Sequence, residues 1–513
     1  MPLRPLNREQ AWILPPTLGE LIPNDHPARF VAEFVDALDR AAWIELGIGL
    51  DGEPLGAPAY HPRALLGVWL HGFMTGVRSS RKLEAACRDQ MPYLWLTGWQ
   101  HPDHNTLWRF YKEHRDKMRH LFKLTVKTAV SMDLVDMAVQ AVDGTKIQAN
   151  AARERTYDAE GLQQLLKRTE TVIDELEKQN EAGDDPSPIH LPEKLRQAQY
   201  LHTEVKAAVE KLTEEEGLKR VNLTDCDAEL MKSRQGIVAG YNIQAVVSPL
   251  KIPETEKTGG VLITAVDTVQ DAEDHHQLVN MLEQAEDTTG KKADITLADA
   301  GYHSGANLAD CEQRKQLVAI PEFQEHRLNP PNHNRFSYDA NTDSYVCPLG
   351  QTLNFIETRR VVRKVVRVYG GLGAVCHLCS AFGVCTKNRY RGRELLIGLD
   401  EAVLRHHREW MATQEAKVAY RRRKELSEPS FGIIKEQMGF RRFLLRGLNN
   451  AKAEVVMIAT AFNMRTLYRA WRWLLNKLWK ISAAETRDYI VVPLLCLLRC
   501  SDTEISDDMV FIG

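Results

Sequence analysis

The feature that most constrains the fold is a carboxylate set inside a short apolar run at residues 139–150, VQAVDGTKIQAN. Val139 and Ile147 favour a buried strand, and Asp143 interrupts it at a cost unless a cation or hydrogen-bond donors compensate. Gly144 suits a tight bend or bulge, and Asp-Gly is a common hairpin signal. One interpretation is therefore a turn aspartate between two strands. The other is a metal-binding carboxylate, which needs partners elsewhere in the chain.

A second carboxylate follows another apolar run at residues 295–304, ITLADAGYHS. Asp299 falls at the end of this predicted strand, Gly301 breaks the strand, and Ser304 could cap the helix that follows. Open α/β sheets place their sites at such strand ends, which weakens the turn interpretation of Asp143.

A third carboxylate lies in residues 421–440, RRRKELSEPSFGIIKEQMGF. Glu428 immediately precedes Pro429, and proline is best tolerated in the first turn of a helix, so Glu428 is predicted near a helix start. Lys435 follows two turns later on roughly the same face. The ordinary interpretation of Glu428 is a first-turn acid that favours the helix dipole.

Together, the segments DGTKIQANA, LADAGYHS and YRRRKELSEPSFGIIK resemble the three signatures of bacterial insertion-sequence DDE transposases, and the resemblance extends over residues 60–468. The last signature usually reads Tyr, Arg, Glu and Lys, which here are Tyr420, Arg423, Glu428 and Lys435. The gap from Arg to Glu is one residue longer than the commonest spacing unless Lys424 replaces Arg423, and Glu425 is the alternative acid.

The resemblance implies a DNA transposase in which Asp143, Asp299 and Glu428 hold two Mg²⁺ (or Mn²⁺) ions for cleavage and strand transfer. It further implies DNA contacts from Lys146, Tyr420, Arg423 and Lys435. The partners would be element ends with inverted repeats and target DNA, bound by a homodimer. The alternatives are an RNase H-type nuclease without strand transfer and a domesticated DNA-binding protein.

The expected fold is α/β, with an RNase H-like mixed β-sheet, flanking helices, a helical N-terminal domain, an inserted helical hairpin and an inserted cysteine-rich knuckle. The predicted boundaries are 1–130 for the helical domain, 131–335 and 396–480 for the catalytic domain, 155–220 for the hairpin, 336–395 for the basic cysteine-rich insertion and 481–513 for a tail. Residues 101–124 are predicted to form one long helix. The helical domain is expected to bind DNA, although a plain helical bundle would give the same periodicity.

Other aspartates compete for the catalytic roles. Asp225, Asp227 and Asp267 lie in or beside the predicted strands. Asp227 belongs to a stretch that these transposases share, and it is interpreted as substrate-positioning or structural.

Four cysteines cluster in the basic insertion. Cys376 and Cys379 form a C-x-x-C, with Cys347 before them and Cys385 after them. This pattern is typical of a structural tetrathiolate zinc site, with His377 as a substitute ligand. A redox pair or reduced thiols in a small core are the alternatives.

Net charge is −3 and gives no indication of a polyanion partner, but its distribution does. Residues 359–393 contain nine basic side chains and no acidic one, and residues 421–424 add four more. Such patches suit DNA, although a charge run is often only a solvated face. No signal peptide or membrane-length apolar stretch is visible, so a cytoplasmic, nucleoid-associated protein without membrane contact is expected.

Overall fold

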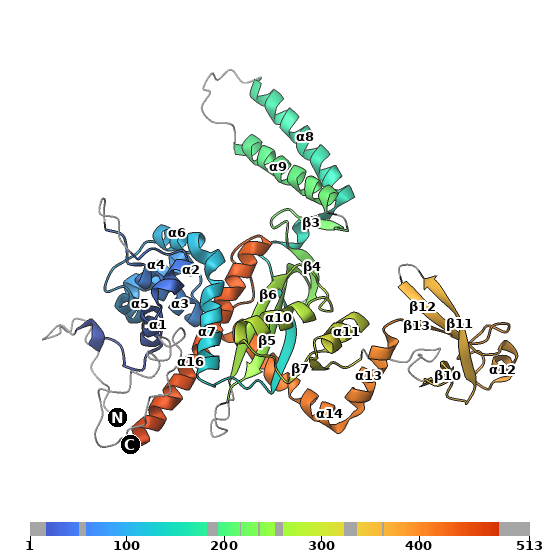
Figure 1. The fold of residues 1–513 in the computed structure, drawn as a ribbon. Helices are drawn as coiled ribbons and strands as arrows, with labels where there is room; N and C mark the ends of the chain where they lie inside the picture. The colour runs from blue at the N-terminus through green and yellow to red at the C-terminus, as the bar shows by residue number, and fades with distance from the viewer. Residues whose placement is uncertain are drawn as a thin grey trace, which may run out of the picture. The chain divides into compact units, whose positions relative to one another are not determined.

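The computed structural model describes residues 17–50, 58–181, 193–215, 217–233, 236–251, 260–322, 336–361 and 364–481. The predicted tail beyond residue 481 lies outside these residues. The chain divides into two compact units. The first comprises Met1–Ala272, Met281–Lys292 and Lys424–Gly513, and the second comprises Glu273–Asn280 and Ala293–Arg423. The mixed α/β character expected from the sequence is confirmed, as is the helical N-terminal region (Figure 1).

The N-terminal part of the first unit is helical. Its segments are η1 (Leu18–Glu20), α1 (Pro27–Asp36), α2 (Arg40–Glu45), α3 (Pro62–Thr75), α4 (Ser80–Asp89), α5 (Met91–Leu96), α6 (His104–His114), η2 (Arg115–Lys117) and α7 (Arg119–Ser131). Proline occupies the first position of α1 and α3, where its missing N–H costs nothing. Helix α3 is buried almost all round, and Trp69 Nε1 donates to Leu107 O at 3.0 Å.

The single long helix predicted for residues 101–124 is wrong. Asp103 caps α6 through Thr106 N at 2.6 Å, but the 3₁₀ turn η2 separates α6 from α7. This tighter turn changes the direction of the side chains that follow, and both Met118 and Leu121 are fully buried.

An antiparallel sheet forms the centre of the first unit. Its strands are β1 (Val139–Gln148), β4 (Glu229–Ser233), β5 (Gly236–Pro249) and β6 (Val261–Val269), with β5 pairing with each of the other three. The long helix α16 (Leu448–Ile481) runs beside β6 and α7 (Figure 1). The side chain of Asn463 on α16 bonds Ile263 N at 2.9 Å and Ile263 O at 2.8 Å, which fixes the helix on β6.

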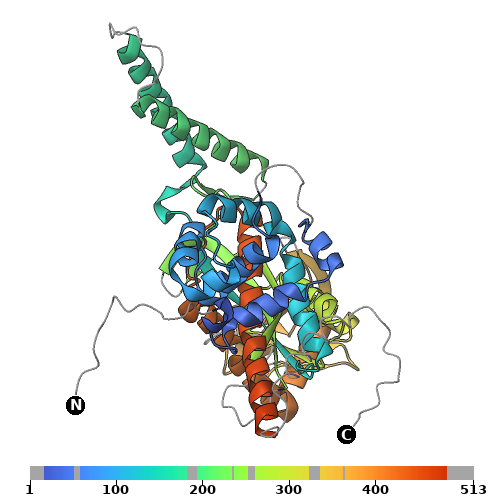
Figure 2. The same cartoon turned by 90° about the vertical axis from the view of Figure 1, so that its left-hand side faces the viewer.

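The inserted hairpin consists of α8 (Ala159–Glu181) and α9 (Glu193–Glu214), which run antiparallel and side by side (Figures 1 and 2). At its base, β2 (Thr156–Asp158) pairs with β3 (Arg220–Asn222). Leu162, Val205 and Val221 belong to a small core that joins the helices to this ribbon. Helix α10 (Leu278–Thr289) follows β6 in the chain.

The second unit contains a parallel βαβ element and a separate sheet. Strand β7 (Ile295–Leu297), the turn η4 (Ala300–Tyr302), helix α11 (Gly305–Gln313) and strand β8 (Leu317–Ala319) form the first, with β7 parallel to β8. The separate sheet is five-stranded and antiparallel, in the order β13-β12-β11-β10-β9. Its elements are β9 (Ser337–Asp339), β10 (Ser344–Val346), β11 (Thr352–Val361), β12 (Lys364–Gly370), α12 (Gly373–Leu378) and β13 (Glu394–Gly398).

Two helices follow this sheet, α13 (Glu401–Ala412) and α14 (Gln414–Arg421). Helix α13 packs against β8, because His407 Nε2 lies 2.8 Å from Ile320 O and Trp410 Nε1 donates to Val318 O at 3.0 Å. Helix α15 (Arg423–Gly432) and the π-helical turn η6 (Ile433–Gln437) then return the chain to the first unit. None of the helices that the structure describes is long and apolar enough to span a bilayer.

Candidate active site

Asp143 lies in the middle of β1, directly opposite Ala245 of β5. The pairing of β1 with β5 runs from Ala141 to Gln148 without a shift in register, so the expected bend or bulge at Gly144 is absent from this part of the strand. The turn interpretation of Asp143 is therefore wrong. The carboxylate is half-buried and accepts a hydrogen bond from Gly144 N at 2.9 Å.

Thr145 connects this strand to the third signature. Residues two apart in a strand point to the same face, so Thr145 lies on the face of Asp143. Lys435 Nζ donates to Thr145 Oγ1 at 2.5 Å, across 290 residues of sequence. The lysine of the third signature is thus held beside the aspartate of the first.

Helix α15 does not begin where the sequence predicts. It starts at Arg423, so Pro429 lies inside the helix and Glu428 is not in the first turn. An interior proline removes one backbone hydrogen bond, and the widened π-helical turn η6 follows directly. Burial of Leu426 and Phe431 on the inner face keeps the segment helical despite the proline.

Glu425 and Glu428 are both exposed on α15. The sequence favours Glu428 as the acid of the third signature and leaves Glu425 as the alternative. Within a continuous helix, side chains three residues apart are neighbours on one face. Position alone therefore does not separate the two acids.

Asp299 follows β7 in the second unit, as the sequence predicts. Its carboxylate accepts from Gly301 N at 2.8 Å, and Ser304 Oγ accepts from Asn307 N at 3.1 Å to cap α11. A side chain at position 301 would begin 3.0 Å from Asp299 Oδ1 and 3.7 Å from Asp274 Oδ2. Asp274 is a second carboxylate near Asp299 that sequence reasoning missed, and the acid- and histidine-rich run DAEDHH was the available signal.

The competing aspartates have structural partners. Asp225 accepts from Tyr241 Oη at 2.8 Å and from Gly447 N at 3.1 Å, and burial raises its pKa. Asp227 caps α16 through Leu448 N at 2.8 Å and pairs with Lys211 at 2.5 Å. Burial opposes ionisation, but these two contacts hold the pKa of Asp227 below its ordinary value.

Asp267 lies between two cations. Its Oδ1 is 3.4 Å from Lys452 Nζ and 3.9 Å from Arg119 Nη2. Thr268 N also donates to it at 2.8 Å. All three competing aspartates therefore have roles in holding the first unit together.

The predicted DNA-binding side chains occupy different surroundings. Lys146 is half-buried on β1, three residues from Asp143, and strand alternation points it to the opposite face. Tyr420 ends α14 and Arg423 begins α15, both half-buried at the end of the second unit. Within the first unit, Lys435 lies on the face of Asp143 through its hydrogen bond to Thr145.

The four clustered cysteines line one cavity of about 250 Å³ in the second unit. Cys347 Sγ accepts from Gln351 N at 3.3 Å, and Cys379 Sγ accepts from Ala381 N at 3.4 Å. Burial raises the pKa of the Cys385 thiol. All seven cysteines that the structure describes are free thiols. His377 packs edge-on against Phe382, with ring centroids 4.8 Å apart.

Neither set of predicted ligands forms a closed metal site in the structure. Among the described residues, no group of three or more His, Cys, Asp or Glu side chains is arranged to hold an ion. The thiols of the cavity and the oxygens of Asp143 and Glu428 nevertheless have the donor chemistry that zinc and magnesium prefer.

Comparison with known families gives two matches. Residues 346–468 match the family described as Transposase DDE domain, and residues 16–113 match the family described as Transposase domain (DUF772). The first match includes Glu428 and Lys435, and the second covers η1 to α5 and all but the last residue of α6. No curated protein matches the chain. The two matches, in this order along one chain, support its assignment as an insertion-sequence DDE transposase.

Proposed function

We propose that this transposase cuts DNA at the ends of its insertion sequence and joins those ends to target DNA, in a metal-dependent reaction. The observation that carries the proposal is the Lys435–Thr145 hydrogen bond, which brings the third signature to the Asp143 face of β1. The strand arrangement supports an RNase H-like catalytic domain, with antiparallel strands first and a parallel βαβ element after them.

Asp143, Asp299 and Glu428 would hold the divalent ions, Mg²⁺ or Mn²⁺. When bound, such ions activate an attacking oxygen and stabilise the leaving oxygen of an in-line displacement. Lys435 is a cation beside Asp143, suited to holding a DNA phosphate in line for attack. Tyr420, Arg423 and Lys146 remain proposed DNA contacts, and Lys146 would act from the other face of β1.

A structural zinc ion is proposed for the cysteine cavity. Backbone N–H groups already donate to Cys347 and Cys379, which is the arrangement that stabilises thiolates. The basic side chains of residues 359–393 lie in the same stretch of sequence as Cys376, Cys379 and Cys385 and would contact DNA. We further propose that the N-terminal helices recognise the element ends and that a homodimer binds the two ends in the cytoplasm.

The test is a cleavage and strand-transfer assay on a duplex made from the ends of the DNA element that encodes the chain. The wild type should nick the end and join it to target DNA with Mg²⁺ or Mn²⁺. Asp143→Ala and Asp299→Ala should abolish both steps and bind the duplex normally. Asp310→Ala, an exposed carboxylate on α11, is the matched control and should keep activity.

Each alternative function has its own outcome in this assay. Nicked ends that never join to target DNA would indicate an RNase H-type nuclease. Binding without cleavage under either metal would indicate a domesticated DNA-binding protein. Normal cutting by either aspartate variant would refute its assignment as a metal ligand.

A further inference from the structure

Arg78 lies in the turn between α3 and α4, yet its guanidinium is almost buried. Its side chain is 9% exposed and forms an ion pair at 2.5 Å with Glu454 of α16, which is 3% exposed. The guanidinium carbon also lies 4.8 Å from the centre of the Phe440 ring. The two partners are 376 residues apart in the sequence, so the pair joins the N-terminal helices to the C-terminal helix of the same unit.

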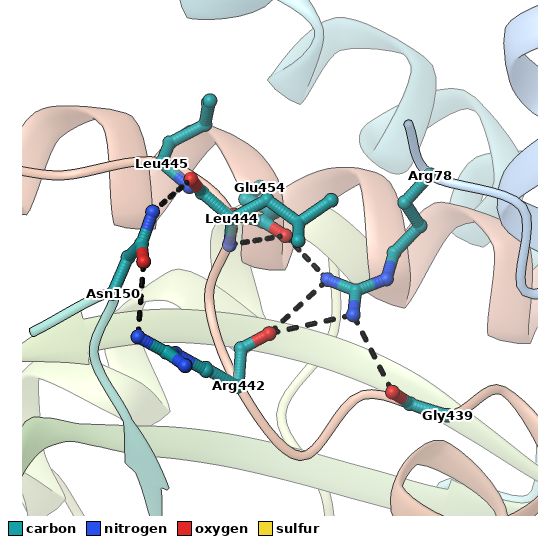
Figure 3. Close-up of polar contacts among 7 residues, drawn as sticks. All are labelled: Arg78, Asn150, Gly439, Arg442, Leu444, Leu445 and Glu454. Atoms are coloured by element: carbon teal, nitrogen blue, oxygen red, sulfur yellow. Dashed lines mark hydrogen bonds and ion pairs between the residues drawn. The ribbon is translucent and has the colours of Figure 1, made fainter. Parts of the chain in front are cut away.

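The pair does more than join two helices, because both partners also bind the backbone of residues 439–445. Arg78 donates to Gly439 O at 3.4 Å and to Arg442 O at 3.3 Å (Figure 3). Glu454 accepts from Leu444 N at 3.0 Å and from Leu445 N at 3.3 Å. Residues 439–445 are thus held at several backbone atoms by one buried ion pair.

The turn that contains Arg78 also approaches this segment through its backbone. Gly76 ends α3 with φ +80°, a left-handed conformation that favours glycine. A side chain at this position would begin 3.2 Å from Met438 O. The contact between the N-terminal turn and the segment after η6 is therefore close over several residues.

On its opposite side, the segment is fixed to the end of β1. Phe443 N donates to Gln148 O at 2.9 Å. Asn150 joins in from just beyond the strand, donating to Leu444 O at 2.8 Å and accepting from Arg442 Nη2 at 3.1 Å (Figure 3). The chain from Glu428 onward is thus attached to β1 at two points, first by Lys435 and then by residues 442–444.

A contribution to the free energy of unfolding does not by itself explain the buried Arg78–Glu454 pair. Burial raises the pKa of Glu454, and the charge of Arg78 offsets this only in part. Buried ion pairs of this kind add little stability compared with apolar residues of similar size. Their hydrogen bonds are directional, however, and here they define where one particular backbone segment lies.

We propose that Arg78 is a positioning residue for the active site. Together with Glu454 it fixes residues 439–445 on β1, and thereby sets Lys435 and Glu428 relative to Asp143. The N-terminal helices would then be a structural part of the catalytic centre as well as a DNA-binding module. The effect on catalysis rests on the proposed function. The attachment of residues 439–445 by Arg78 and Glu454 can be tested without DNA.

The main test compares the wild type with the double variant Arg78→Met/Glu454→Gln. The double variant removes both buried charges, keeps the volume, and keeps a carbonyl that can accept from Leu444 and Leu445. It should therefore unfold near the wild-type temperature, whereas Arg78→Met alone leaves a buried carboxylate unpaired and should be clearly less stable. Arg155→Met, which removes a half-exposed partner of Glu204 at the base of the hairpin, is the matched control.

Two measurements are made on each variant. Amide hydrogen exchange on the full chain without DNA should be at least about tenfold faster across residues 433–445 in the double variant, and unchanged in β5 and β6. Cleavage of the end duplex should fall about 10- to 100-fold and require more Mg²⁺ for half-maximal rate, with normal duplex binding. The control should match the wild type in both.

A double variant with wild-type exchange, or one in which cleavage recovers together with stability, would overturn the positioning role. A wild type that fails to cut under any metal would instead refute the proposed function. The exchange measurement would still decide whether Arg78 fixes the segment.

Discussion

Two sheets of this protein differ in how many of their residues are buried. In the first unit, β5 and β6 are buried along almost their whole length, and β1 is buried over its first four residues. In the second unit, β11 exposes most of its residues, and the core of the five-stranded sheet consists of Phe336, Tyr345, Leu353, Tyr369, Leu395 and Ile397. The sheet of the first unit forms a buried core, whereas the five-stranded sheet has only this small apolar cluster.

The difference shows what each sheet needs for stability. A sheet covered on both faces gains enough apolar burial to fold by itself. A small sheet with one modest cluster usually needs a disulfide or a metal as well. Cys347 and Cys385 pack against that cluster, so the thiols lie where such a cross-link would act. The comparison predicts that the two sheets respond differently to loss of metal.

The largest expected effect is therefore zinc removal. Purified protein should contain about one zinc per chain, and a strong chelator in reducing buffer should unfold β9–β13 and leave β1, β5 and β6 protected. Structural zinc contributes on the order of 10 kcal/mol to small domains, which is enough to decide whether this sheet folds. Elemental analysis and amide hydrogen exchange of the same sample measure the two halves of the prediction.

Cys376→Ser should reproduce the effect of chelation, because it removes one of the four thiolates. The control is Cys311→Ala, which removes a buried thiol of the same unit outside the cavity and should retain zinc. Zinc-free protein with a fully protected five-stranded sheet would show that this sheet is stable by itself. The two sheets would then not differ in their need for a metal.

The second expected effect concerns Glu428, the acid of the third signature, which lies in the first unit. We expect Glu428→Gln to reduce metal-dependent cleavage by about 10³-fold, equivalent to about 4 kcal/mol, by removing a metal ligand. Glu425→Gln should lose less than about threefold, since we assign Glu425 to offsetting the basic run before it. Both side chains are exposed on α15, so neither change should affect folding.

A side-by-side cleavage assay across a Mg²⁺ titration separates the two acids. The helix places them on one face, so the assignment depends on the better spacing from Glu428 to Lys435. If Glu425→Gln is the inactive variant, the extra residue between Arg423 and Glu428 marks a shifted signature, and Glu425 is the ligand.

Local patterns predicted the parts of the site that local chemistry determines. The strand around Asp143, the position of Asp299 after β7 and the Ser304 cap all follow from short apolar runs and their endings. The interior position of Pro429 could not be predicted in this way, because the preference of proline for a first turn was outweighed by the burial of its neighbours.

Contacts between distant segments were also invisible in the sequence. Neither the Lys435–Thr145 bond nor the Arg78–Glu454 pair has a local signature, since the first depends on how η6 returns to β1 and the second on how α16 meets the turn before α4. The continuous strand through Gly144 is a further case, because its partner β5 lies about a hundred residues later and supplies a pairing residue for every position from Ala141 to Gln148. Such features require the tertiary fold.

The smallest expected effect concerns the first unit, where protonation of the buried imidazole of His71 in α3 should lower stability. This side chain is 2% exposed, with its ring 4.9 Å from that of Tyr93. Burial lowers the pKa of His71 to about 4 from the 6.5 of an unfolded chain. The folded state therefore prefers the neutral ring. The stability that depends on this preference is complete above pH 6.5 and is lost as the pH falls from 6.5 towards 4.

At pH 5 the loss should be about 2 kcal/mol relative to pH 7.5, from linkage of folding to one proton. Amide exchange of α3, corrected for the intrinsic rate at each pH, gives the free energy of opening there. His71→Leu should flatten this dependence, because it removes the titrating group and leaves an apolar side chain in an apolar site. His61→Asn, which keeps an acceptor at the start of α3, should retain the wild-type slope. Equal slopes in the wild type and His71→Leu would mean that the pH dependence of the opening of α3 comes from a group other than His71.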